Sequence, residues 1–167
     1  MGLLRVSVWV FAALTLTGLG LMFFYAPTVS QNVATGTQHK TLTLGGVLRG
    51  THFWAAHILG LILLLHLLAL MARRGATYDS KWRSGLAALW LLLLAVALWF
   101  TGLVLPWDQM TYWLMELARE RGIRLSLLQI YWAHIALLPI VFGASAFFGI
   151  RYLKQGKRPS SRMGTAG

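Results

Sequence analysis

The sequence has no cysteine, little charge and almost no acidic residues. Of its 167 residues only 11% are charged, 57% are hydrophobic, and the mean hydropathy is +0.65. Soluble domains carry about 25% charged residues, so this shortfall predicts that lipid is the main solvent of the chain. The length predicts one domain over residues 1–167. The absence of cysteine excludes disulfides, iron–sulfur ligation and thioether attachment of haem by this chain.

Acidic residues are scarce enough to leave a strong positive balance. The chain has 15 Lys and Arg against 4 Asp and Glu, a net charge of +11. In a soluble protein this balance would suggest a nucleic-acid partner. In an apolar chain it is better explained by the positive-inside rule, under which basic residues gather beside membrane helices on the cytoplasmic side. We therefore expect a lipid bilayer and no nucleic acid as a partner.

Four apolar stretches approach the roughly 20 residues that a helix needs to cross a bilayer. They run over about 6–25, 51–72, 86–105 and 129–152, and a basic tail covers 153–167. This pattern predicts an all-α integral membrane four-helix bundle. The first stretch is longer than the roughly 7–15 apolar residues of a signal peptide, so we expect a retained helix.

The basic residues divide unevenly between the two ends of these helices. Five lie with the connections 26–50 and 106–128: Lys40, Arg49, Arg119, Arg121 and Arg124. Ten lie with the termini and the middle connection: Arg5, Arg73, Arg74, Lys81, Arg83, Arg151, Lys154, Lys157, Arg158 and Arg162. The excess predicts that both termini are cytoplasmic. We expect the membrane to be a bacterial inner membrane.

The connection over 106–128 is also expected to hold a short interfacial helix. Trp113, Leu114 and Leu117 would face lipid, and Glu120 would pair with Arg124 four residues on.

Three histidines carry the functional signal. His52 and His66 are 14 residues apart, which is nearly four whole turns, so they share one face of a helix about 21 Å apart. His134 opens the fourth span at the depth of His52, and the two can face each other across a haem. His57 is rotated away from both, which favours packing or a hydrogen bond. Spacing alone leaves open whether these histidines bind haem or are buried structural residues.

His66 lacks a facing ligand. Fourteen and fifteen residues after His134 come Phe148 and Gly149, and neither coordinates metal.

The chain resembles the amino-terminal, four-helix half of cytochrome b, especially the short form found in photosynthetic quinol–plastocyanin oxidoreductases. The resemblance rests on Thr17-Gly18, on 24–29 and 48–54, on 101–109 with its Leu-Pro-Trp-Asp-Gln run, and on Tyr131 to His134 followed by Leu138-Pro139. It implies two bis-histidine haems between the second and fourth helices. His52 and His134 match the outer pair, and His66 matches one ligand of an inner haem whose partner falls at Gly149.

Around these ligands, Arg49 lies one turn before His52 and is a candidate contact for a haem propionate. Gly18 and Gly102 are expected where helices or a flat macrocycle approach closely. We expect one haem b and leave a second open: His66 is a relic in the core, an axial ligand with a vacant far side, or a ligand completed by a partner.

The resemblance also limits the activity. The Pro-Glu-Trp-Tyr motif of the family's quinol site is not in this sequence, so the polypeptide alone is not expected to be a complete quinol oxidase. The predicted function is a b-type cytochrome subunit passing electrons between the quinone pool and a partner redox centre. Expected partners are a subunit equivalent to the carboxy-terminal half of cytochrome b, an iron–sulfur protein or a c-type cytochrome. The alternative is a structural anchor of a redox complex that binds no haem.

Overall fold

The computed structural model describes the backbone of residues 2–25, 44–72, 78–106 and 109–155, and within these ranges all regular structure is helical. The elements are α1 (Gly2–Leu21), α3 (Leu44–Met71), α4 (Tyr78–Val104), α5 (Gln109–Glu120), α6 (Leu127–Trp132), the π-helical turn η1 (Ala133–Leu137) and α7 (Leu138–Gln155). Four segments are long and apolar enough to cross a membrane: Gly2–Leu21, Leu44–Met71, Trp82–Val104 and Leu127–Arg151. The predicted all-α four-helix architecture is confirmed.

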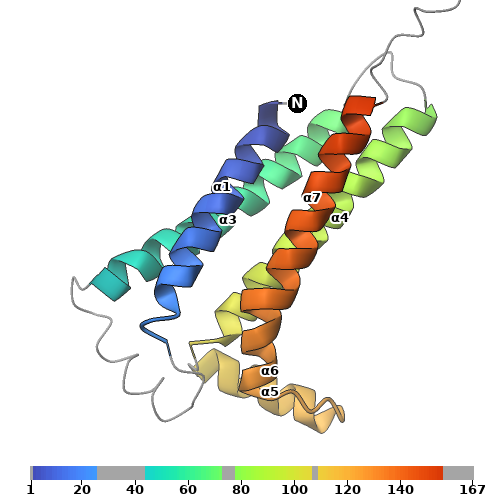
Figure 1. Cartoon of the computed structure of the whole chain (residues 1–167). Coiled ribbons are helices and arrows are strands. Elements are labelled where there is room, and N and C mark those ends of the chain that lie inside the picture. The colour runs from blue at the N-terminus through green and yellow to red at the C-terminus, as the bar shows by residue number, and fades with distance from the viewer. Residues whose placement is uncertain (1, 26–43, 73–77, 107–108, 156–167) are drawn as a thin grey trace, which may run out of the picture.

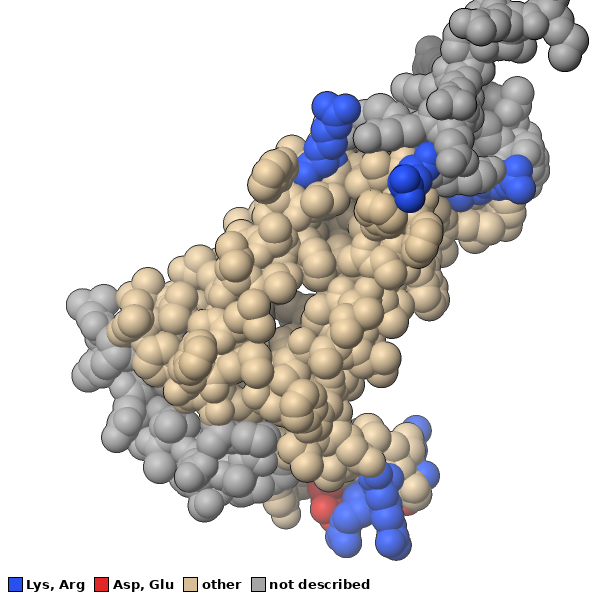
Figure 2. All heavy atoms as spheres, in the orientation of Figure 1, with Lys and Arg blue, Asp and Glu red and all other residues tan. Residues whose placement is uncertain are grey.

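The helices alternate in direction and pack in sequence order, α1 on α3, α3 on α4, and α4 on α7. The start of α1 and the end of α7 lie at one end of the bundle, which we call the terminal end (Figure 1). The short helix α5 lies across the opposite end, the α5 end. Figure 2 shows a broad belt without charged side chains between the two ends, as expected for a surface that faces lipid.

The second span begins earlier than the sequence predicts. Residues 44–50 contain three glycines, which are poor helix formers by about 1 kcal/mol each, and yet α3 starts at Leu44. The ring of Phe24, just past the end of α1, lies 3.3 Å from the position that a Cβ of Gly45 would occupy. Packing against α1 therefore holds a segment helical that its own composition disfavours.

The fourth span begins with a capping box. Ser126 Oγ accepts a hydrogen bond from the Gln129 backbone N–H at 3.2 Å, and Gln129 Oε1 accepts one from the Ser126 N–H at 2.8 Å. These bonds satisfy two backbone donors at the helix start, so the helix begins at Leu127 rather than at Gln129.

A π-helical turn interrupts this span at Ala133–Leu137, and the N–H of Leu138 reaches back five residues to the Ala133 carbonyl. Pro139 explains the irregularity, because it has no N–H to donate and its ring crowds the carbonyl of Ile135 four residues before it.

Helix α5 is the interfacial helix expected in the 106–128 connection, but two of its details were predicted wrongly. It ends at Glu120, so Arg124 is not on it, and the ion pair that forms is Glu116 with Arg119. Trp113 and Leu117 are exposed as expected, whereas Leu114 packs against the bundle. Gly122, with φ of 78°, ends the helix, and the N–H of Ile123 bonds to the Ala118 carbonyl at 2.9 Å.

Two groups of buried apolar side chains organise the interior. The central cluster occupies the middle of the bundle and comprises Leu4, Leu14, Leu59, Leu63, Leu91, Leu94, Ala95, Phe142 and Ala146. The end cluster lies beside α5 and comprises Val104, Leu105, Leu127, Ile130 and Tyr131.

Candidate functional site

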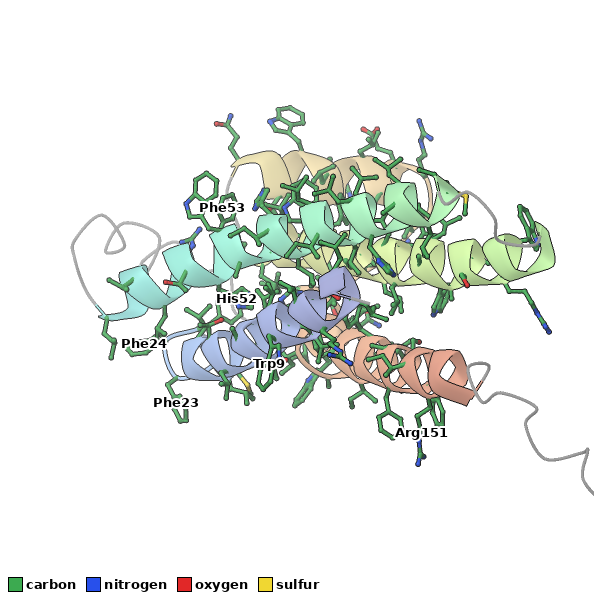
Figure 3. All side chains as sticks on the ribbon, turned by 90° about the horizontal axis from the view of Figure 1, so that it is seen from above. Trp9, Phe23, Phe24, His52, Phe53 and Arg151 are labelled. Atoms are coloured by element: carbon green, nitrogen blue, oxygen red, sulfur yellow. The ribbon has the colours of Figure 1, made fainter. Side chains whose placement is uncertain are left out.

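His52 of α3 and His134 of η1 face each other in the half of the bundle nearer the α5 end. Their ring centres are 6.2 Å apart and their planes are inclined by 72°. Figure 3 shows His52 on the side of α3 that faces α1, with its neighbour Phe53 on the opposite side of the helix. The two histidines that the sequence places at equal depth are therefore brought together by the fold.

The separation of the rings fits a single metal ion between them. A metal–imidazole bond is about 2.0–2.1 Å, and the ring centre lies about 1.1 Å beyond the nitrogen, so two imidazoles on opposite sides of one ion have centres about 6.3 Å apart. Within the described residues, no three His, Asp or Glu side chains are grouped to hold a bare metal ion. Haem needs only two protein ligands, because its macrocycle supplies four nitrogens. The donor set fits haem better than a free cation.

Two threonines determine which nitrogen of each imidazole is available. Thr17 Oγ1 lies 3.0 Å from His52 Nδ1, and Thr101 Oγ1 lies 3.0 Å from His134 Nδ1. Each hydroxyl donates its only hydrogen to a carbonyl of its own helix: Thr17 to Ala13 at 3.0 Å or Leu14 at 3.1 Å, Thr101 to Ala97 at 2.8 Å or Leu98 at 3.0 Å.

With their hydrogens on these carbonyls, the threonine oxygens are free to accept the Nδ1–H of the histidines, and the backbone carbonyls of Leu14 and Leu98 lie within reach of the same rings. A proton held on Nδ1 in this way leaves the Nε2 lone pair of each ring available to iron.

The glycine after each threonine makes room for the same ring. A Cβ at Gly18 would lie 3.2 Å from His52 Cε1, and a Cβ at Gly102 would lie 2.9 Å from His134 Cε1. Carbon atoms in ordinary contact are about 3.5–4.0 Å apart, so a larger residue at Gly102 would displace the imidazole. α1 and α4 thus present equivalent Thr-Gly pairs, one to each histidine.

The histidines line a cavity of about 630 Å³, which is within the usual range of about 300–1,000 Å³ for cofactor and ligand sites. Its floor is formed by Phe11, Leu14, Leu59 and Ala95, which belong to the central cluster or pack against it. At the α5 end Tyr131 of the end cluster stacks on Tyr25, with ring centres 5.5 Å apart, and Tyr25 Oη donates to the Leu105 carbonyl at 2.8 Å. Apolar and aromatic side chains therefore lie on both sides of the ring pair.

Arg49 also lines the cavity, near the start of α3. Its guanidinium is solvent-exposed at the α5 end of the site. An exposed cation at the rim suits a carboxylate on a group that is otherwise buried in apolar surroundings.

His57 takes no part in this arrangement, and its predicted structural role is confirmed. Its Nδ1–H donates to the Phe53 carbonyl at 2.8 Å, and its Nε2 accepts a hydrogen bond from Trp99 Nε1 at 3.1 Å. Both ring nitrogens are used, so no lone pair is left for a metal.

His66 lies away from the cavity. It is buried in α3, about one turn beyond Leu63 of the central cluster. Its side chain has an interaction partner there. A Cβ at Gly149, on α7, would meet no atom within 4 Å. The structure thus separates His66 from the group formed by His52, His134, Gly18, Gly102 and Arg49.

Thr17, Thr101, Tyr25 and the Ser126–Gln129 cap were not singled out as site residues from the sequence. The signal that could have found the threonines is the recurrence of Thr-Gly in the first and third spans. The Ser-x-x-Gln pattern before an apolar run is likewise a recognised helix start.

Comparison with known proteins places these residues in a wider context. A family model described as cytochrome b/b6/petB matches residues 1–120, which include both Thr-Gly pairs and His52. Cytochrome b6 of Heliomicrobium gestii is 30% identical, over 81% of this chain and 75% of its own length. Cytochrome b6 of Heliobacterium mobile is 29% identical, over 75% and 68% respectively. Cytochrome b6 of Prochlorococcus marinus strain AS9601 is 31% identical, over 60% of this chain and 46% of its own length.

Proposed function

Because the chain belongs to the cytochrome b family, a family of multi-pass membrane proteins of electron-transfer complexes, we propose that it carries electrons through one haem b ligated by His52 and His134. The observation that carries the proposal is the pair of facing imidazoles 6.2 Å apart, each with its Nδ1 within 3.0 Å of a threonine hydroxyl. When bound there, haem b would supply reversible one-electron transfer between ferric and ferrous iron, with His52 and His134 as the residues that hold it.

The chain's own residues hold and tune this group. Thr17 and Thr101 keep the imidazoles in the metal-binding tautomer, and Gly18 and Gly102 allow the rings to sit close to α1 and α4. Arg49 is our candidate contact for a propionate, since a guanidinium binds a carboxylate through two hydrogen bonds. The two apolar clusters keep water from the iron, which raises the cost of charge there and so influences the potential.

We further propose that the chain is one subunit of a larger oxidoreductase. Electrons would pass between the quinone pool and a partner redox centre, with a quinone pocket completed by a neighbouring subunit equivalent to the carboxy-terminal half of cytochrome b. An iron–sulfur protein or a c-type cytochrome would be the soluble redox partner. The membrane would be a bacterial inner membrane with the terminal end cytoplasmic.

The test is the absorbance of the purified chain after reduction. We expect a b-type α-band that disappears in His52→Ala and in His134→Ala, because each change removes an axial ligand. His57→Gln is the matched control: it removes a histidine from the same helix as His52 and should leave the band unchanged.

A wild-type chain without haem would instead support the structural anchor without a cofactor. Retention of the unaltered band in either alanine variant would show that these two histidines are not the ligands.

A further inference from the structure

The half of the bundle near the terminal end can be compared with the haem site position by position. Moving 14 residues along a helix covers about 21 Å and returns to nearly the same face. On α3 this step leads from His52 to His66, and on α1 it leads from Gly18 to Leu4. On α4 it leads from Gly102 to Ala88. The two glycines that make room for the imidazoles are thus replaced by residues with side chains.

On the fourth span the interval between equivalent positions is 15 residues rather than 14. Because the π-helical turn adds a residue within η1, the position on α7 that corresponds to His66 is 15 residues after His134, at Gly149. The half of the bundle near the terminal end therefore lacks one ligand and both glycines.

Buried side chains of the central cluster lie between the two halves. Leu63 is 1% exposed and Phe142 is 2% exposed, and the ring of Phe142 packs on that of Phe11, at the floor of the cavity, with centres 4.4 Å apart. Leu4 and Ala88, at 8% and 4% exposure, are also buried. Around His52, by contrast, Gly18 and Gly102 are only partly buried, because they border the cavity. Buried side chains thus stand, in the half near the terminal end, at the positions that correspond to these two glycines.

From this asymmetry we infer that the half of the bundle near the terminal end is closed to a second haem, and that His66 is a packed core residue. The inference rests on the proposed function for the outer pair. A second haem would lack room in this half as well as a second ligand. Admitting a macrocycle would require the central cluster to separate, and protein cores resist such expansion because they are packed as densely as organic crystals.

A consequence follows for the route of electrons. His52 is 8 residues, about 12 Å, from the start of α3, and 19 residues, about 28 Å, from its end at Met71. Tunnelling rates fall steeply with distance, and the intervening central cluster is apolar. A reduced donor would therefore deliver an electron from the α5 end, and an oxidised acceptor would remove it from the same end. The chain by itself would not carry electrons across the membrane.

The first test supplies the missing ligand. Gly149→His introduces an imidazole where a Cβ meets no neighbour within 4 Å, and Gly149→Ala is the matched control. Haem per chain is measured by pyridine haemochrome against protein concentration. We expect one haem per chain in the wild type and in both variants, because neither substitution removes the buried side chains of Leu4 and Ala88. Two haems in the wild type, or a second haem gained by Gly149→His, would overturn the inference. No haem in the wild type would instead refute the proposed function.

The second test follows electrons directly and does not depend on a variant at Gly149. The wild-type chain is reconstituted into vesicles that trap ferricyanide, and dithionite is added outside. We expect reduction of the haem but loss of trapped ferricyanide no faster than with His52→Ala. A lipid-soluble quinone added to the same vesicles serves as the positive control. Haem-dependent reduction of the trapped ferricyanide would overturn the inference.

Discussion

Which ring nitrogen of His52 and His134 carries the proton decides which nitrogen can bind iron. Thr17 and Thr101 can donate to the carbonyls of their own helices, and their oxygens are then free to accept from the histidines. In metalloproteins such partners orient the ligand ring and increase its basicity. We therefore expect the candidate site to depend on two hydroxyl groups that lie beside the proposed ligands rather than on them.

Thr101→Val tests this dependence at the residue scale. Valine has nearly the same shape but has no hydroxyl to bond Nδ1 of His134, so the buried ring loses its threonine partner. Losing such a partner typically reduces metal-site affinity by about 10- to 100-fold, and we expect haem affinity to fall within that range. Thr101→Ser keeps the hydroxyl and should bind haem like the wild type. Haem titration into the apoprotein measures both, and equal affinity in the valine and serine variants would contradict the role.

At the scale of elements, the irregular fourth span shows how one proline sets the register of a ligand. Pro139 forces the π-helical turn that contains His134, which rotates this residue relative to α7. Without the turn, the face that carries His134 would continue at residue 148, and with it the face continues at Gly149. The register of the candidate ligand is thus a property of the element rather than of the histidine alone.

The interfacial helix α5 offers a prediction on pH. The hydrogen bond from Arg119, with Nη2 lying 2.6 Å from Glu116 Oε1, and the attraction of the guanidinium lower the pKa of Glu116 below its ordinary value of 4.5. A lowered pKa means that the stabilisation is present above pH 4.5 and is lost as pH falls through the lower value.

We expect the carboxyl ¹³C shift of Glu116 to titrate below 4.5, and Arg119→Gln to move the midpoint up toward 4.5. A midpoint that does not respond to this substitution would show that the pair does not form in solution.

At the scale of the whole molecule, the bundle is asymmetric in both packing and charge. The cavity lies at the α5 end, whereas ten of the 15 basic residues belong, in the sequence, to the termini and the middle connection. If the positive-inside rule holds, the proposed haem site lies close to the outer face of the membrane. The described arginines Arg5, Arg83 and Arg151 belong to the helix ends on the opposite side.

Because the chain has no native cysteine, its topology can be read with single cysteines. A membrane-impermeant maleimide applied to intact cells should label Arg121→Cys at the α5 end. Arg5→Cys near the start of α1 should be labelled only after the membrane is permeabilised. The reverse pattern would overturn the assignment of the terminal end to the cytoplasm.

The sequence by itself determined the features that depend on composition and on spacing along one helix. Low charge and four apolar runs predicted the membrane bundle, and the 14-residue interval predicted that His52 and His66 share a face. Equal depth in helices of the same direction predicted that His52 meets His134, and the rotation of His57 predicted its structural role. These properties are visible in sequence because the periodicity of a helix is regular.

Only the tertiary structure decided what depends on neighbours from other helices. Phe24 packing on Gly45 extends α3, and Phe142 packing on Phe11 fills the middle of the bundle. The threonine partners of the ligands come from α1 and α4, 35 and 33 residues away in sequence. Such contacts cannot be read from local pattern, because side-chain packing depends on which residues of two helices meet at the same depth.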